Sequence, residues 1–222
     1  MDKLKEMLDS ARSGDHPACS SCLRNPKKNN TSFAINCDEH YGTEKNGLII
    51  MARDPGASVG GSSHTGILCP IHNSDISAKR LLSNLSLIKI ANRSIYFHRS
   101  IYFLNTILHG FFNENSKANN NTERKHCRVV LSEIIACLQP RGILALGLEA
   151  LQSTIEILQE SEIQKPTLKQ MVQKSFSYGE ISGVNVFAMP HPAYSLVNLR
   201  KQGLNETDVW QDVAKMINRV FR

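Results

Sequence analysis

Two side chains in this sequence follow apolar segments at points where a reacting group could be placed. Asp54 opens an Asp-Pro-Gly turn just after the apolar run 48–52, and His191 stands between two prolines after the run 184–190. An aspartate there can position water or stabilise positive charge on a sugar during glycosidic cleavage. A neutral imidazole between rigid neighbours can donate a hydrogen bond to a developing anion. The alternative for Asp54 is an ordinary turn without a catalytic role, and the alternative for His191 is a purely structural histidine.

Strands alternating with helices must position these two side chains. Apolar runs predict strands at 48–52, at SIYFLNTI ending near Asn105, at GILALG (142–147) and at VNVFAMP (184–190). Helical spacing predicts helices at about 1–16, 75–89, 122–138, 148–158 and 208–221. This order predicts an α/β fold, with a three-layer αβα architecture and a mainly parallel central sheet in a single domain over residues 1–222.

The predicted topology brings the strand ends and their polar residues to one edge of the sheet. Ligands bind beyond the carboxyl ends of parallel strands, and those ends carry Asp54, Asn105, Gly147 and His191. The loop after Asp54 offers small side chains and backbone N–H groups that suit close approach of a phosphate backbone. A flexible surface loop is the alternative. The candidate contacts in it are Gly56, Gly60, Gly61, Ser62, Ser63 and His64.

Composition narrows the class of protein. The 222 residues suffice for one well-buried domain, and the formal net charge of +6 suits a polyanionic partner. No apolar run approaches the roughly eighteen residues of a membrane helix, and the N-terminus lacks the apolar centre of a secretory signal. We therefore expect a cytoplasmic protein that does not bind a membrane and is a monomer. The Asn-rich stretch at about 113–123 predicts a mobile loop.

The N-terminal segment at about 17–47 contains a candidate metal site. Cys19, Cys22, Cys37 and His40 form the spacing C-x2-C-x14-C-x2-H, which suits tetrahedral zinc. A zinc ion would also stabilise a segment that lacks a clear apolar core. Unliganded or redox-active thiols are the alternative.

Four segments together resemble the uracil-DNA glycosylase superfamily. They are MARDPG, FLN, CRVVLSEIIACLQPRGILALG and MPHPAYSLVNL, and they occur in the order seen in that superfamily, over about residues 17–200. The resemblance implies a uracil-DNA glycosylase-like fold and a DNA glycosylase, which flips a pyrimidine out of DNA and hydrolyses its N-glycosidic bond. A non-catalytic DNA-binding module on a degenerate glycosylase fold is the alternative. A nucleotide-binding α/β protein is disfavoured because the sequence has no spaced-glycine dinucleotide fingerprint and no P-loop motif.

The resemblance also implies a role for individual residues. Asp54 would orient the attacking water or stabilise the sugar cation, His191 would hydrogen-bond the base oxygen, and Asn105 would read the edge of the flipped base. Leu196 or Leu199 would fill the gap left in the duplex, with a core leucine as the alternative for both. Further DNA contacts would come from Ser195 and Arg200.

Two departures from the family pattern bear on substrate and cofactor. Where the family has a ring that stacks on uracil, TGILCP offers only residues such as Leu68. The substrate is therefore expected to be uracil or a bulkier modified pyrimidine, such as glucosylated hydroxymethylcytosine in phage defence. The second departure concerns the iron–sulfur-containing branch, whose pattern implies a 4Fe-4S cluster on Cys19, Cys22, His109 and Cys127, with His109 where the family has cysteine. Zinc bound by Cys19, Cys22, Cys37 and His40 is favoured slightly over this cluster.

Overall fold

The computed structural model describes residues 2–28, 31–33, 45–53, 76–90, 93–94, 101–111 and 120–222. Its centre is a five-stranded sheet in the order β5-β2-β7-β9-β8. The strands are β2 (Leu48–Ala52), β5 (Ile101–Asn105), β7 (Gly142–Leu146), β8 (Ser177–Ile181) and β9 (Val184–Met189). All neighbours are parallel except the edge pair β8 and β9, so the predicted mainly parallel sheet is confirmed.

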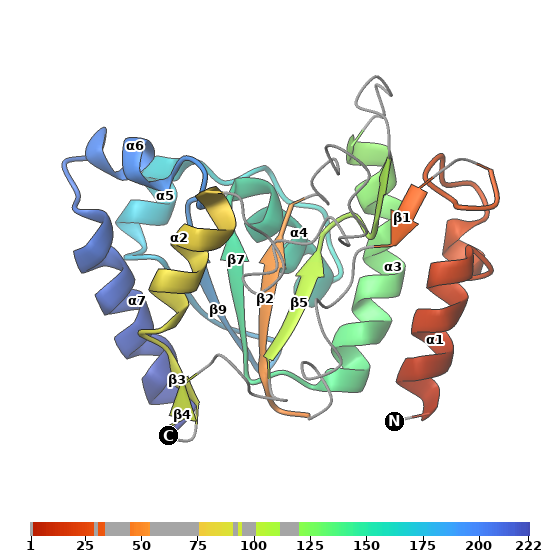
Figure 1. The fold of residues 1–222 in the computed structure, drawn as a ribbon, viewed down its shortest axis with the longest axis horizontal. Coiled ribbons are helices and arrows are strands. Elements are labelled where there is room, and N and C mark those ends of the chain that lie inside the picture. Colours follow the sequence, from red (N-terminus) through yellow and green to blue (C-terminus); the bar gives the residue numbers. More distant parts are fainter. Residues whose placement is uncertain are drawn as a thin grey trace.

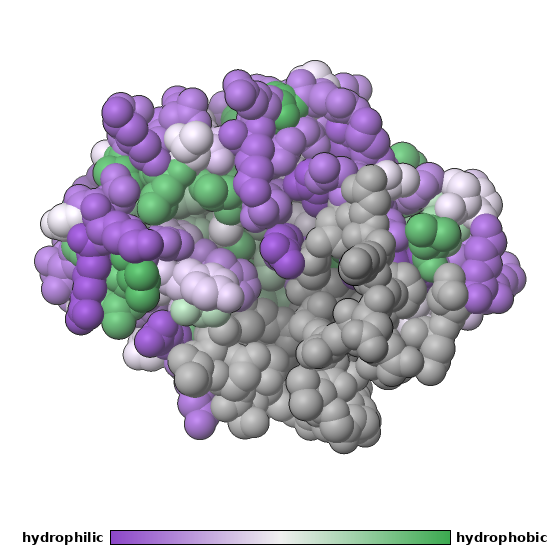
Figure 2. All heavy atoms as spheres, turned by 90° about the horizontal axis from the view of Figure 1, so that it is seen from above, coloured by the Kyte–Doolittle hydropathy of each residue, from purple (hydrophilic) through white to green (hydrophobic). Residues whose placement is uncertain are grey.

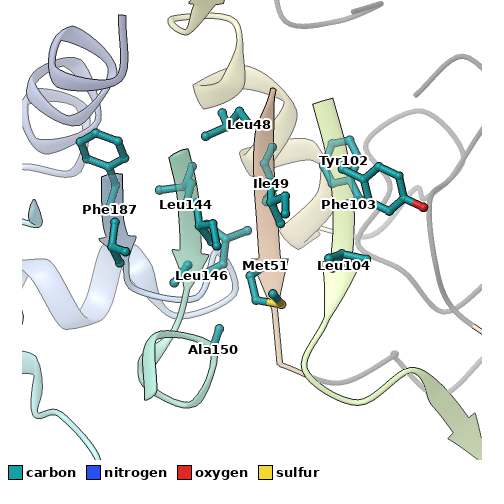
Figure 3. Close-up of a cluster of buried hydrophobic side chains, with 14 of the residues drawn as sticks. Leu48, Ile49, Met51, Tyr102, Phe103, Leu104, Leu144, Leu146, Ala150 and Phe187 are labelled. Atoms are coloured by element: carbon teal, nitrogen blue, oxygen red, sulfur yellow. The ribbon is translucent and has the colours of Figure 1, made fainter. Parts of the chain in front are cut away.

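The parallel strands are apolar throughout because both faces of the sheet are covered. Every residue of β2, β5 and β7 is buried, as expected where helices lie on both sides of a parallel sheet. The core side chains of these strands belong to one buried apolar cluster together with Phe187 of β9 and Ala150 of the following helix layer (Figure 3). By contrast β8, with sequence SYGEI, is only partly buried. Its polar residues explain why the apolar pattern did not predict it.

Helices complete the three layers. The remaining long helices are α1 (Asp2–Ser13), α2 (Ile76–Leu85), α3 (Asn120–Leu138), α4 (Leu148–Gln159) and α7 (Glu206–Val220). The helix α4 packs on β7 and β2, α3 packs on α4, and α1 packs on α3. On the other side α7 packs on β9 and α2 packs on α7, as Figure 1 shows. The fold class predicted from the sequence is therefore confirmed.

Shorter elements connect these layers. They are the 3-10 helix η1 (Pro17–Cys19), α5 (Leu168–Gln173), α6 (Ser195–Arg200), and two small antiparallel sheets formed by β1 (Thr31–Phe33) with β6 (His109–Phe111) and by β3 (Lys89–Ile90) with β4 (Arg93–Ser94). The N-terminal helix ends at Ser13, before the expected residue 16, because Gly14 turns the chain with a φ of 79°.

The Asn-rich stretch needs one correction. The helix α3 already begins at Asn120, so residues 120–123 belong to a helix and not to the predicted loop. Glu123 is buried there, which anchors this end of the helix. Residues 113–119 lie outside the described part of the chain. Within the described residues, no helix has the length and apolar character needed to cross a membrane.

Candidate active site

The carboxyl ends of the parallel strands meet at one edge of the sheet, as expected. Ala52 is level with Asn105, and Leu146 is level with Met189. The ends of β2 and β5 are tied together beyond the sheet: the Thr106 hydroxyl donates to the carbonyl of Arg53 at 2.6 Å, and the Ile107 N–H donates to the same oxygen at 3.2 Å. These two bonds fix the chain where it leaves β2 toward Asp54.

Several predicted residues of this edge lie outside the described residues. They are Asp54, Leu68 and the phosphate-loop candidates Gly56, Gly60, Gly61, Ser62, Ser63 and His64. Figure 2 looks down on this edge, where hydrophilic side chains predominate on the described surface and apolar patches occur on the side of α5, α6 and α7. Of the candidate pocket residues, the structure describes Asn105, Gly147 and His191.

Asn105 is the most unusual side chain of the site. It is 0% exposed at the last position of β5, and neither its Nδ2 nor its Oδ1 has a hydrogen-bond partner in the part of the chain that the structure describes. Buried amides are almost always paired, because leaving one unpaired is costly. An orphaned amide at the carboxyl end of a parallel strand is therefore suited to a ligand that both accepts and donates hydrogen bonds.

The orientation of His191 follows from its backbone neighbours. The Ala193 N–H donates to Nδ1 of His191 at 3.3 Å. A nitrogen that accepts carries no proton in the neutral ring, so the neutral tautomer has its proton on Nε2. The neutral ring therefore donates its hydrogen bond from Nε2, and the role predicted for this side chain needs such a donor.

Gly147 supports His191 from the next strand. Its φ of 105° lies in the region that favours glycine, and its N–H donates to the carbonyl of Met189 at 2.7 Å. A Cβ at this position would stand 3.5 Å from the Cβ of His191. The glycine thus lets the β7–α4 turn pack directly against the histidine, and it also begins α4.

Hydrogen bonds to neighbouring helices hold the segment that follows His191. The carbonyl of Pro192 accepts hydrogen bonds from Arg80 of α2 at 3.4 Å and from the Ser195 hydroxyl at 3.3 Å. The Ser195 hydroxyl also contacts the Glu206 carboxylate at the start of α7. These contacts connect the histidine loop to α2, which lies far away in the sequence, and to α7, which follows the loop closely.

The residues that were predicted to contact DNA differ in how exposed their side chains are. Ser195 and Leu199 are fully buried, so neither side chain presents itself to a ligand outside the protein, and Leu199 matches the core alternative. Leu196 is partly exposed and Arg200 is exposed. Sequence reasoning missed Tyr194, which is 65% exposed with its ring centroid 6.4 Å from that of His191. Its signal was an aromatic residue in a short polar turn, HPAYS.

Charged side chains line the neighbouring rim. Burial by itself would raise the pKa of Glu149, but hydrogen bonding from Lys165 and the nearby charges of Lys165 and Arg53 lower it. Glu149 is the second residue of α4, and Arg53 directly precedes Asp54. The rim next to β2 therefore carries an ionised carboxylate between two cations.

Three of the candidate metal-ligating cysteines are described, and all are buried free thiols: Cys19, Cys22 and Cys127. Burial raises the pKa of Cys19 to about 11 and that of Cys127 to about 12, with smaller contributions from the neighbouring thiols. The Leu108 N–H donates to Sγ of Cys127 at 3.5 Å, so β6 begins beside this sulfur. Cys37, His40 and the side chain of His109 are outside the described residues.

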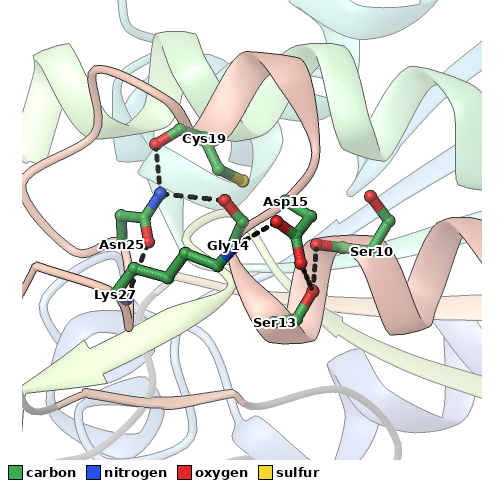
Figure 4. Close-up of polar contacts among 7 residues, drawn as sticks. All are labelled: Ser10, Ser13, Gly14, Asp15, Cys19, Asn25 and Lys27. Carbon is green, nitrogen blue, oxygen red and sulfur yellow. Dashed lines mark hydrogen bonds and ion pairs between the residues drawn. The ribbon is translucent and has the colours of Figure 1, made fainter.

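The Cys19–Cys22 turn is held by hydrogen bonds within the protein (Figure 4). The buried Asn25 amide donates to the carbonyls of Gly14 and Cys19 at 3.0 and 2.9 Å and accepts from the Lys27 N–H at 2.8 Å. Searched over the described ranges alone, no three His, Cys, Asp or Glu side chains are arranged to hold a single metal ion. The turn is thus preformed, although the described side chains do not complete a single-ion site.

The sheet is mainly parallel and covered on both faces, which defines an α/β protein. At its carboxyl edge lie an amide without a hydrogen-bond partner among the described residues and an oriented histidine, and this edge is the candidate ligand site. The model of the uracil DNA glycosylase superfamily matches residues 40–214, and the chain belongs to this superfamily. Its members are generally DNA glycosylases, hydrolases that act on DNA. Cys19 and Cys22 precede the matched region. No individual curated protein matches the chain by sequence.

Proposed function

We propose that this protein extrudes a pyrimidine nucleotide from DNA and hydrolyses its N-glycosidic bond, leaving an abasic site. The observation that carries the proposal is the buried amide of Asn105, neither polar atom of which has a hydrogen-bond partner among the described residues. A pyrimidine presents adjacent donor and acceptor groups on its Watson–Crick edge, and an amide pairs with both. Binding such an edge would supply hydrogen-bond partners to these two buried polar atoms.

The reaction would use His191 and Asp54 on either side of the base. As the bond between C1′ and the base nitrogen breaks, negative charge develops on the base oxygens, and the Nε2–H of His191 would stabilise it by hydrogen bonding. Asp54 would stabilise the cationic sugar and orient the water that attacks C1′. The oxygen of that water becomes the new hydroxyl on C1′, and the base leaves with the bonding electrons and is then protonated.

The substrate base is proposed to be uracil or a larger modified pyrimidine. The segment at 67–69 contains no aromatic residue, and stacking on a ring contributes roughly 1–3 kcal/mol per base at comparable sites. Losing that contact weakens the preference for plain uracil and leaves space for a substituent on the ring. Glucosylated hydroxymethylcytosine, a base of phage DNA, fits this description and would give the enzyme an antiviral role.

A panel of oligonucleotides tests the proposal. Single- and double-stranded DNA with one uracil, thymine, cytosine, hydroxymethylcytosine or glucosylated hydroxymethylcytosine would be incubated with the protein, and abasic sites would be detected by alkaline cleavage. We expect excision of at least one modified base or of uracil, and a rate about 10²–10³-fold lower for His191→Ala with little change in DNA affinity. If every substrate stays intact while DNA binding persists in wild type, Asp54→Asn and His191→Ala alike, the non-catalytic alternative is correct.

The contact with the flanking duplex is proposed to come from the exposed side of α6. Leu196 remains the candidate for the side chain that fills the gap left by the extruded base, since Leu199 is buried. Arg200 is exposed on the same short helix and would contact a phosphate.

A metal group is proposed for the N-terminal segment. Zinc on Cys19, Cys22, Cys37 and His40 is the first candidate, because these four residues have the spacing of a tetrahedral site. A 4Fe-4S cluster on Cys19, Cys22, His109 and Cys127 is the alternative, and the burial of Cys127 together with Cys19 and Cys22 supports it. When bound, the cluster would join the N-terminal segment to α3 and take no part in bond cleavage. Iron, sulfide and zinc contents of the purified protein decide between the two.

A further inference from the structure

Two of the four large apolar side chains that are exposed in the described part of the chain lie together, shortly after His191. Tyr194 is 65% exposed and Val197 is 54% exposed, whereas the other two, Leu23 and Val129, belong to other segments. Single exposed apolar residues are normal on a protein surface. A pair grouped at the edge of a candidate active site calls for an explanation.

The backbone of α6 determines which side chains share its exposed face. The carbonyl of Tyr194 accepts a helical hydrogen bond at 2.9 Å, and the N–H of Lys201 donates one to the carbonyl of Val197 at 3.1 Å. The helical path therefore includes Tyr194 and Lys201, and residues three or four apart on it are neighbours. Tyr194, Val197 and Lys201 thus follow one line on the helix surface, while Ser195 and Leu199 form the opposite, buried face.

Two cations complete this exposed face. Arg200 and Lys201 are both exposed, and neither forms an ion pair with another side chain that the structure describes. We call Tyr194, Val197, Arg200 and Lys201 the α6 stripe; it presents one aromatic ring, one aliphatic side chain and two positive charges. In Figure 1, α6 lies at the end of the molecule to which the arrows of β2, β5 and β7 point, so the α6 stripe is at the same end as the candidate active site.

The backbone of Tyr194 is held close to His191. The Tyr194 N–H donates to the carbonyl of His191 at 2.9 Å, and the two ring centroids are 6.4 Å apart with their planes inclined by 45°. The tyrosine ring is nevertheless largely open to solvent, whereas His191 is partly buried. The exposed ring can therefore contact a group that lies just outside the base pocket.

We propose that the α6 stripe binds the DNA strand beside the extruded nucleotide, with Tyr194 stacking on the neighbouring base; this inference rests on the function proposed above. Bases stack on exposed aromatic rings with little regard to sequence, and cations beside the ring hold the phosphate backbone. A base whose neighbour has been extruded loses one of its stacking partners in the strand. The ring of Tyr194 replaces that contact, and Arg200 and Lys201 neutralise adjacent phosphates.

The test measures DNA binding separately from catalysis. The probe is a fluorescent single-stranded oligonucleotide with one 2′-fluoro-2′-deoxyuridine, whose fluorine resists hydrolysis because it destabilises the sugar cation. Followed by anisotropy, Tyr194→Ala should raise Kd about tenfold and Tyr194→Phe should leave it unchanged, because the ring and not the hydroxyl makes the contact. Lys201→Met should reduce the slope of log K against log salt by about 0.7. The matched control is Lys5→Met, exposed on α1 on the opposite side of the molecule (Figure 1), which should change neither quantity.

Oligonucleotides that lack single bases locate the contact. With a tetrahydrofuran abasic analogue on one side of the target, Tyr194→Ala should bind as well as wild type. The same analogue on the other side, or at the target itself, should preserve the difference. The proposal is overturned if the difference persists on every oligonucleotide or disappears only when the target base is removed. It is also overturned if Tyr194→Ala slows excision without changing Kd, since the ring would then act only through His191.

Two parallel measurements separate this inference from other causes. The exposed positions of Tyr194 and Lys201 predict an unchanged Tm for their variants, so a loss of binding cannot come from unfolding. Excision is measured on the substrate panel. Binding that depends on Tyr194 without any excision would refute the glycosylase proposal alone, and excision with no effect of Tyr194→Ala on binding would refute this inference alone.

Discussion

Replacing Asn105 with leucine should make the protein more stable and inactive. The side chain is fully buried and both amide atoms lack partners in the described structure, and each unsatisfied buried group costs about 1–3 kcal/mol. Leucine has a similar volume and no polar atoms, so after some loss to repacking we expect a gain of about 1–2 kcal/mol. At about 2–4 °C per kcal/mol for a chain of this size, Tm should rise by about 2–8 °C. Excision should fall at least about 10²-fold because the base edge has lost its partner.

Asn25→Leu is the matched control. Asn25 is also buried, but its amide makes three hydrogen bonds, to Gly14, Cys19 and Lys27. Its replacement leaves three backbone groups unpaired and should lower Tm, with a loss of at least about 2 kcal/mol. Thermal unfolding followed by circular dichroism, with excision measured on the same samples, gives both quantities. A lower Tm for Asn105→Leu would refute the reasoning, since it would mean that the amide is satisfied in the free protein.

Three further substitutions, with Gly179→Ala as a control, test the histidine loop and the helix α6 that follows it. Gly147→Ala and Gly179→Ala both place a side chain at positive φ, so each should lower the free energy of unfolding, measured by chemical denaturation, by roughly 1–2 kcal/mol. Only Gly147→Ala should slow excision, because only its added Cβ contacts His191. Equal excision rates for the two variants would contradict this role of Gly147. Leu196→Ala should weaken excision from duplex DNA more than from single strands, and an identical loss on both would remove Leu196 as the gap-filling residue. Ser195→Ala breaks the contact with Glu206 and should lower Tm by a few degrees. Its loss of excision activity should be smaller than that of His191→Ala. An unchanged Tm would show that this contact does not anchor the histidine loop.

The sequence predicted the parallel sheet well because its strands are short, continuous apolar runs followed by turn residues. β2 and β5 end where the sequence placed them, at Ala52 and Asn105. The edge strand β8 was missed because one face of it is open to solvent and its residues are polar. The start of α3 was placed too late, since Asn120 and Asn121 were taken for a loop and not for the first turn of a helix.

The site was predicted less completely because burial depends on contacts between distant segments. The positions of Asn105, Gly147 and His191 at one edge followed from strand order. The sequence did not show that Ser195 and Leu199 face inward, since α6 is too short for its pattern to define a buried face. The ion pair of Arg24 and Glu123 joins residues 99 apart, a distance at which no local pattern pairs two charges.

The fit between Gly14 and Asn25 has an evolutionary consequence. A Cβ at position 14 would stand 2.2 Å from Oδ1 of Asn25, so no other residue is compatible with the present position of that amide. A relative that loses the asparagine also loses the reason for the glycine, and a relative that gains a side chain at position 14 must first replace the asparagine. We therefore expect positions 14 and 25 to change together among related sequences, with the shape of the Cys19–Cys22 turn changing alongside them.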